Sequence, residues 1–72
     1  MQRQDTTKLT HRIGRRIVNL RGDQTQEEFA RQVGISRGYL SDIERGVREM
    51  SLETLARICH ETKVSSNYIL GL

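Results

Sequence analysis

The chain has 72 residues, a formal net charge of +3, no Pro or Trp, and a single cysteine, Cys59. A chain of this length forms one small domain that buries roughly 60% of its unfolded surface, and one cysteine excludes an internal disulfide. No apolar run approaches the ~18 residues of a membrane span, and the N-terminus lacks the apolar core of a signal peptide. We therefore expect a soluble cytoplasmic protein.

Positive charge is concentrated at the N-terminal end. Residues 1–21 hold six basic residues and one acidic residue, a net charge of +5, whereas residues 22–72 hold six basic and eight acidic residues, a net charge of −2. The six basic residues of the first part are Arg3, Lys8, Arg12, Arg15, Arg16 and Arg21. A basic flank favours a polyanionic partner such as nucleic acid; the alternative is a solvated helix face.

A first helix is expected after a flexible N-terminal segment, residues 1–7, with one domain over residues 8–72. Asp5 or Thr7 can cap this helix. Its apolar stripe follows helical spacing and consists of Leu9, Ile13, Ile17 and Leu20. Gly22 and Asp23 end the helix.

A second helix begins at Thr25, where Thr25 and Glu28 form a capping box that contributes about 1 kcal/mol. The cap places Gln26 in the first turn with its amide free to point outward. Gly34 ends the helix with a positive φ, and Ala30 supplies the small side chain needed where two helices meet at a steep angle. The inner face carries Phe29, Ala30 and Val33. With a third helix after Gly34, this is the geometry of a helix-turn-helix.

Three serines are expected to cap the remaining helices, each preceded by an apolar residue that can pack onto the helix it caps. The serines are Ser36, Ser51 and Ser65, and the apolar pairs are Ile35 with Leu40, Met50 with Leu55, and Val64 with Ile69. Gly46 and Gly71 end the third and fifth helices. The predicted stripe of the fourth helix is Leu52, Leu55, Ala56 and Cys59. No strand alternation occurs, so the predicted fold is all-α with five helices.

The third helix has an apolar inner side, because Ile43 and Val47 fall within about 60° of Leu40 around the helix axis. Arg37 extends from the first turn and Tyr39 lies on one flank. The opposite side carries Gly38, Ser41, Asp42 and Arg45. A small polar face of this kind can enter a major groove. There, Arg37 can donate two hydrogen bonds to guanine, and Asp42 can accept one from cytosine or orient Arg37 or Arg45.

Gly38 and Glu44 each allow two interpretations. Gly38 costs about 1 kcal/mol relative to Ala; it either lets the backbone approach a base pair or a thymine methyl, or is tolerated at little cost as a second-turn position. Glu44 lies near the buried edge of the helix, where an unpaired carboxylate is unfavourable. We predict a structural ion pair between Glu44 and Arg21; the alternative is that Glu44 extends to water.

These motifs together resemble the Cro/cI-type, or XRE, family of helix-turn-helix regulators. The resemblance runs from about Leu9 to Gly71 and rests on IGRRI and NLR, TQEEFARQVGIS, YLSDIERG, SLETLARI and VSSNYILG. It implies a five-helix, lambda-repressor-like domain that binds operator DNA, usually as a two-fold dimer. The short chain, with SRGYLSDIERGVRE at its centre, looks most like restriction–modification control proteins and small phage repressors.

The resemblance also implies which residues meet DNA. The implied base contacts are Arg37, Gly38, Ser41 and Asp42. The implied contacts to the phosphate backbone are Gln26, Ser36, Tyr39, Arg45 and Arg48. Arg21 and Glu44 match a structural ion pair common in these domains, in agreement with the prediction made from the residues themselves.

The chain departs from the family pattern in two loops. The connection Gly22–Gln24 is about two residues shorter than usual. Glu49 and Met50 stand where the family often has Asn-Pro or a basic residue, which makes the phosphate contact of Arg48 the least secure of those implied.

The sequence does not favour a metal site or a catalytic site. Cys59 and His60 are neighbours on a helix and point about 100° apart, so they cannot share a metal ion, and we expect Cys59 to be buried. The chain has no nucleophile–base pair and no glycine-rich phosphate loop. We therefore expect no cofactor, no small-molecule ligand and no enzymatic activity.

The C-terminal helix is more apolar than a short surface helix requires. Its apolar residues are Tyr68, Ile69, Leu70 and Leu72. Part of this cluster can form a homodimer interface, which would place two recognition helices about 34 Å apart; the alternative is that all of it closes the core of the monomer.

Three functions follow from these observations. The first is transcriptional control through sequence-specific binding to a palindromic operator, as a repressor or control protein. The second is a protein-interaction module, antitoxin-like or adaptor, because acidic residues dilute the basic surface; these are Glu27, Glu28, Asp42, Glu49 and Glu53. The third, a small enzyme, has no residue constellation behind it.

Overall fold

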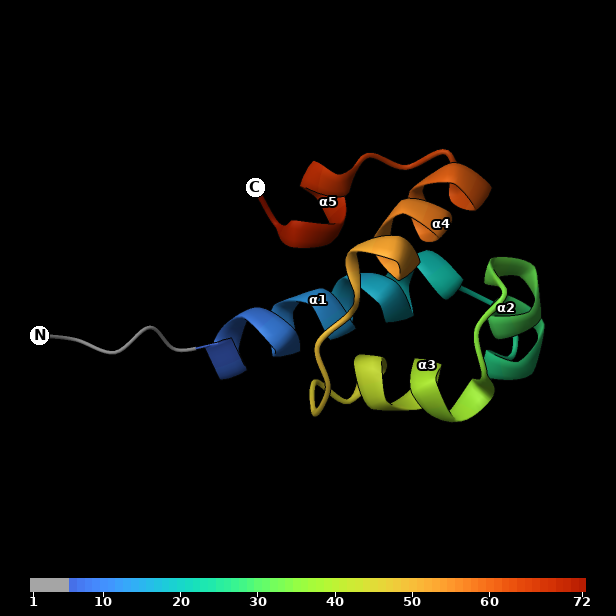
Figure 1. Cartoon of the computed structure of the whole chain (residues 1–72), viewed down its shortest axis with the longest axis horizontal. Coiled ribbons are helices and arrows are strands. Elements are labelled where there is room, and N and C mark those ends of the chain that lie inside the picture. Colours follow the sequence, from blue (N-terminus) through green and yellow to red (C-terminus); the bar gives the residue numbers. More distant parts are fainter. Residues whose placement is uncertain (1–5) are drawn as a thin grey trace, which may run out of the picture.

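The computed structural model describes residues 6–72, and their side chains from Lys8 onward. Within this range the chain forms five α-helices and no strands (Figure 1): α1 (Thr6–Arg21), α2 (Gln26–Val33), α3 (Arg37–Glu44), α4 (Leu52–Thr62) and α5 (Ser66–Leu70). Helix α1 crosses the middle of the molecule and contacts α3 on one side and α5 on another, while α2 contacts both α3 and α4. The predicted all-α, five-helix fold is confirmed, with α2 and α3 as the helix-turn-helix.

The N-terminal boundary differs from the expected one. Helix α1 begins at Thr6, so Thr7 lies within the helix and does not cap it. Asp5, the other expected cap, and the first five residues of the expected flexible segment lie outside the described residues.

The predicted N-terminal caps of α2, α3, α4 and α5 are confirmed. The Thr25 hydroxyl accepts a hydrogen bond from the Glu28 amide at 3.0 Å, and the Glu28 carboxylate accepts one from the Thr25 amide at 2.9 Å. The three serine hydroxyls accept hydrogen bonds from backbone amides in the first turns of α3, α4 and α5. Gly34 ends α2 with φ 87°, a left-handed conformation that favours glycine. Because these caps depend on local chemistry, the helix boundaries follow the sequence closely.

The core is a single apolar cluster between the five helices. Its fully buried large side chains are Phe29, Ile17, Leu40, Ile43, Ile58 and Ile69. Ala30 and Val33 complete the cluster, and Ile35, Met50 and Val64, the predicted packing partners before the serine caps, lie against it. Helix α5 has only five residues and would not form alone, so the burial of Ile69 anchors it to the domain.

The buried face of α4 is rotated from the predicted one. Leu52 is 83% exposed and Ala56 is exposed, whereas Thr54 and Ile58 are buried. Thr54 tolerates burial because its hydroxyl accepts a hydrogen bond from the Ser51 hydroxyl at 2.9 Å. The predicted stripe is therefore confirmed in part: Leu55 and Cys59 pack against the core, whereas Leu52 and Ala56 do not. Cys59, expected to be buried, is only partly so.

Val47 was also predicted on the wrong side. It is 63% exposed, because α3 ends at Glu44 and Gly46 turns the chain with φ 76°. The helical angle used to place Val47 on the inner face therefore does not apply beyond Glu44.

At Gly14 the backbones of α1 and α3 lie close together, a feature that the sequence did not reveal. A Cβ atom at this position would lie 2.6 Å from the carbonyl oxygen of Glu44 and 2.7 Å from that of Ile43. No side chain fits such a gap. This contact fixes the C-terminal end of α3 against α1 and thereby orients the outward face of α3.

Candidate nucleic-acid interface

The outward face of α3 is polar and open. Arg37 and Gly38 are exposed, and Ser41 and Asp42 are partly exposed. A Cβ atom at Gly38 would meet no other atom within 4 Å. Ser36, at the start of this face, uses its hydroxyl to accept a hydrogen bond from the Tyr39 amide at 3.0 Å. The four residues predicted to contact bases therefore share one accessible surface.

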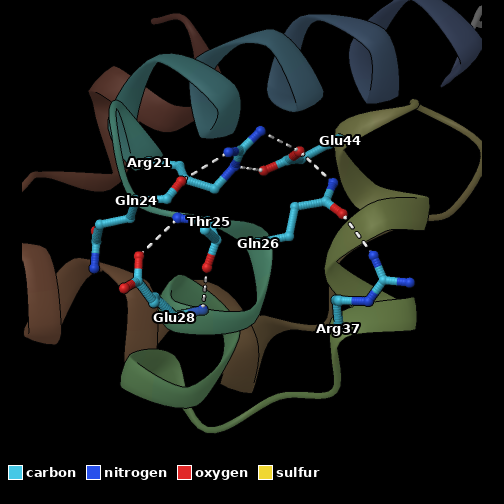
Figure 2. A network of polar contacts seen from close by, with 7 residues as sticks. All are labelled: Arg21, Gln24, Thr25, Gln26, Glu28, Arg37 and Glu44. Carbon is cyan, nitrogen blue, oxygen red and sulfur yellow. Dashed lines mark hydrogen bonds and ion pairs between the residues drawn. The ribbon is translucent and has the colours of Figure 1, made fainter.

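Arg21 and Glu44 form a two-pronged ion pair at the end of α1 (Figure 2). Arg21 Nε donates to Glu44 Oε2 at 2.7 Å, and Nη2 donates to Oε1 at 3.1 Å. The Glu44 side chain is only 5% exposed, so it does not extend to water. The hydrogen bond to Glu44 raises the pKa of Arg21 above its ordinary value, and outweighs the opposite effect of burial. The guanidinium therefore stays charged and joins α1 to the last residue of α3.

Gln26 links this ion pair to the outward face of α3. Its side-chain amide is therefore not free, contrary to the expectation. Gln26 Nε2 donates to Glu44 Oε1 at 2.8 Å, and Gln26 Oε1 accepts from Arg37 Nη1 at 3.4 Å. Figure 2 shows the resulting chain of contacts from Arg21 through Glu44 and Gln26 to Arg37. The first residue of α3 is thus connected to the buried pair at its last residue.

Asp42 holds two of the cations predicted to meet phosphate. Its carboxylate lies 2.6 Å from Arg45 Nη2 and 3.9 Å from Arg48 Nη1. Of the two partners expected for Asp42, Arg45 is therefore the one it orients, whereas Arg37 bonds to Gln26 instead. The contact to Arg48 was not foreseen, because Arg48 lies in the loop beyond the helix.

Tyr39 joins α3 to the start of α4. Its hydroxyl accepts a hydrogen bond from the Ser51 amide at 3.0 Å, and the Arg48 guanidinium lies 5.0 Å from its ring centroid. Burial raises the pKa of Tyr39, but the hydrogen bonds with Ser51 and Thr54 and the charge of Arg48 together lower it below its ordinary value. Tyr39 therefore positions Arg48 as well as lying on the flank of the recognition face.

The C-terminal cluster divides between core and surface. Ile69 is fully buried and so cannot take part in a dimer interface, which corrects its predicted role. Leu70 is partly buried, Tyr68 is 37% exposed and Leu72 is 84% exposed. An apolar groove of about 280 Å³ lies beside this cluster, and its apolar lining consists of Leu9, Ile13, Met50, Leu52, Leu55 and Leu70.

Residues 6–72 contain no group of three or more His, Cys, Asp or Glu side chains that could hold a metal ion. None of the helices described is both long and apolar enough to cross a membrane.

Comparison with known proteins places these features in a family. The family model described as "Helix-turn-helix" matches residues 20–69. Antitoxin PezA of Streptococcus pneumoniae is 48% identical over 61 residues, which cover 82% of this chain but 39% of that protein. Control protein C.MunI of Mycoplasma sp. is 42% identical over 50 residues, which cover 65% of this chain and 68% of that protein.

A solved structure agrees with this placement. The hypothetical transcription factor NHTF from Neisseria superimposes with a TM-score of 0.78 at 25% sequence identity, over 97% of this chain and 83% of that one. The match of the family model includes both helices of the turn and the recognition face. The chain therefore belongs to the XRE-type helix-turn-helix family of DNA-binding transcription regulators.

Proposed function

We propose that this protein controls transcription by inserting α3 into the major groove of a palindromic operator as a homodimer, acting as a repressor or control protein in the cytoplasm. The observation that carries the proposal is the open polar face from Arg37 to Asp42, held in a fixed orientation by the Arg21–Glu44 pair and the close contact at Gly14. A rigid helix with small polar residues on its outer side matches the shape of the major groove.

The base contacts proposed are Arg37, Gly38, Ser41 and Asp42. Arg37 is proposed to contribute most to base specificity, because a guanidinium can donate two hydrogen bonds to the O6 and N7 atoms of guanine. The open space at Gly38 allows the backbone to approach a base pair. Asp42 faces the same groove. When Arg45 leaves Asp42 to contact a phosphate, the Asp42 carboxylate accepts a hydrogen bond from cytosine instead.

The phosphate contacts proposed are Gln26, Ser36, Tyr39, Arg45 and Arg48. Arg45 and Arg48 supply the charge, and both lie beside Asp42, so a phosphate oxygen can take the place of its carboxylate. Gln26 and Ser36 lie at the first turns of α2 and α3, where backbone amides favour an anion.

The dimer contact proposed is the apolar groove together with Tyr68, Leu70 and Leu72, and its occupant is a second copy of this chain. A two-fold contact pairs a surface with itself, so the surface needs both a hollow and a projection. Leu52, at the rim of the groove, is 83% exposed and supplies the projection. This contact would set two α3 helices about 34 Å apart, one turn of DNA.

Selection from a random library of duplex DNA tests the proposed function. The expected result is a short enriched motif with two-fold symmetry, whose half-sites contain a guanine that Arg37→Ala no longer selects. A selection that enriches no sequence would contradict operator recognition. The matched control is Arg31→Ala, which removes an exposed cation from the last turn of α2 and should leave the motif unchanged.

A protein-interaction module is the second candidate function. The relative named antitoxin PezA favours it, and this chain spans 39% of the length of that protein. The acidic residues Glu27, Glu28, Glu49 and Glu53 are exposed and could face a basic partner. The same selection separates the two functions, because an interaction module without DNA recognition would enrich no motif.

A further inference from the structure

The outer face of α1 carries a second concentration of positive charge, away from the recognition helix. It forms an open hollow of about 870 Å³ lined by Lys8, His11, Arg12, Arg15, Arg16 and Asn19. No acidic residue lines this hollow, and none occurs in α1. The proposed reading of DNA through α3 makes no use of these side chains.

Two guanidinium groups of this face contact uncharged partners. Arg12 Nε donates to the carbonyl oxygen of Leu70 at 3.2 Å, and Arg16 lies 5.0 Å from the centroid of the Tyr68 ring. Both partners carry no net charge. Among residues 8–72, the arginines that form ion pairs are Arg21, Arg45, Arg48 and Arg57. Arg12, Arg15 and Arg16 thus keep positive charge that no carboxylate of the described chain neutralises.

This face and the α3 face point in different directions. Helix α3 contacts α1 at Gly14. The outward face of α3, the reading face formed by Arg37, Gly38, Ser41 and Asp42, lies on the side of α3 away from that contact. The basic residues of α1 lie roughly 100° to 160° around the helix from Gly14. A duplex seated along the reading face of α3 therefore does not lie over the α1 face.

The chemistry of the face fits a phosphate backbone better than an acidic protein. Its cationic residues follow one another at i, i+3 and i+4, with Cβ atoms about 5–6 Å apart, and arginine is suited to phosphate oxygens. The centre of a protein interface is usually apolar or aromatic, whereas all six residues that line this hollow are polar and four of them are Lys or Arg. Interfaces with nucleic acid are more polar and more positive.

We propose that the outer face of α1 is a second, sequence-independent binding surface for the phosphate backbone of duplex DNA. One domain can then hold two duplex segments, one read by α3 and one bound through charge alone. Arg15 is the most direct test residue, because it is exposed and has no contact that holds α5 in place.

The test is an NMR titration of the full chain with duplex DNA of random sequence at low salt. The expected result is movement of the α1 signals of Arg12, Arg15 and Arg16 as well as the α3 signals. Arg15→Glu should weaken the α1 titration, and the matched reversal Arg31→Glu, on α2, should not. The salt slope of the α1 titration should fall by about one in Arg15→Glu, as expected for one lost phosphate contact.

The outcomes separate this proposal from operator reading by α3. Movement of α3 signals alone would overturn the α1 surface and leave operator reading intact. Movement of α1 signals alone would support the α1 surface and contradict reading by α3. A titration with polyglutamate at equal charge that moves the α1 signals equally would overturn the choice of DNA in favour of an acidic protein surface.

Discussion

Arg21 Nε lies 2.7 Å from Glu44 Oε2, and this contact joins the last residue of α1 to the last residue of the recognition helix. The Glu44 carboxylate also accepts a hydrogen bond from Gln26, which in turn accepts one from Arg37. One buried carboxylate thus connects three helices and the first residue of the reading face. Its removal should affect both the stability of the domain and the position of Arg37.

Glu44→Ala should lower the free energy of unfolding by about 3 kcal/mol, the low end of the range for a broken buried ion pair. The low end applies because the Arg21 side chain keeps 20% exposure and can recover some hydration. Urea unfolding measures the change. Glu61→Ala is the control, since Glu61 is an exposed residue of α4, and should stay within about 0.5 kcal/mol of the wild type. Equal stability of the two variants would show that the pair contributes little.

Gly14→Ala should destabilise the domain by about 1–3 kcal/mol, because its Cβ would meet the carbonyl oxygens of Glu44 and Ile43. Those oxygens belong to the backbone of α3 and cannot move without displacing the reading face. Gly38→Ala should instead stabilise by about 0.5–1 kcal/mol, since its Cβ meets open space in the first turn of a helix. Thermal unfolding should therefore show Tm shifts of opposite sign; a higher Tm for Gly14→Ala would contradict the close contact.

The features that depend on residues close together in the sequence could be predicted from it. Helix ends depend on residues a few positions apart, so the capping box of Thr25 and the positive φ of Gly34 could be predicted from the sequence. The fold class and the helix-turn-helix followed from this local chemistry together with the family resemblance. The Arg21–Glu44 contact followed from the cost of an unpaired carboxylate near the core, again together with the resemblance.

The features that could not be predicted from the sequence depend on how the helices are arranged in three dimensions. The tight gap at Gly14 exists only because residues 43 and 44 return to α1, and helical periodicity carries no trace of it. The rotation of α4 has a similar cause, because Thr54 is buried through a hydrogen bond to its own cap while Leu52 stays exposed. The bonding of Gln26 to Glu44 likewise requires knowing that α2 and α3 bring these side chains together.

Tyr39 should ionise at a lower pH than its ordinary pKa of 10.0, because hydrogen bonds with Ser51 and Thr54 and the charge of Arg48 outweigh the effect of burial. An acid whose folded pKa is depressed contributes stability above its unfolded pKa, which is lost as pH falls through the folded pKa. The stability of the wild type relative to Tyr39→Phe should therefore increase with pH in the window from the folded pKa of Tyr39 up to about 10.

Ultraviolet titration of Tyr68→Phe checks this prediction, since that variant leaves Tyr39 as the only tyrosine. Urea unfolding of the wild type and Tyr39→Phe across the same pH range gives the stability difference. Arg48→Ala in the Tyr68→Phe background should raise the midpoint, because it removes a positive charge beside the ring. A midpoint at or above 10.0 in Tyr68→Phe would exclude a net stabilisation of the phenolate.

Leu52→Lys should weaken self-association at least tenfold, because burial of a leucine contributes about 1.5–3 kcal/mol and every 1.4 kcal/mol is tenfold in Kd. Sedimentation over a concentration series measures the dimer Kd. Val18→Lys is the control, since Val18 is 40% exposed and is not among the residues that line the groove. A wild type that stays monomeric at high micromolar concentration would rule out the proposed dimer.

Arg37→Ala and Arg45→Ala should affect DNA binding in different ways, because one side chain is proposed to read bases and the other phosphate. Arg37→Ala should lose about 1–3 kcal/mol on the selected sequence and relax the preference at one base pair. Arg45→Ala should weaken binding to all sequences alike and lower the salt slope by about one. Asp42 would then lose its nearer cation, keep only Arg48 at 3.9 Å and repel phosphate. Asp42→Asn in the same background removes that charge but keeps an acceptor oxygen for cytosine, so it should recover part of the affinity.

Fluorescence anisotropy with the selected duplex and with single-base variants, at several salt concentrations, measures both effects. Arg31→Ala is the control, because Arg31 is an exposed cation in the last turn of α2 and is not among the proposed DNA contacts. If Arg37→Ala and Arg45→Ala bind every duplex as the wild type does, the outward face of α3 is not the surface that meets DNA. If both lose affinity without any change in base preference, α3 binds the backbone and sequence is read elsewhere.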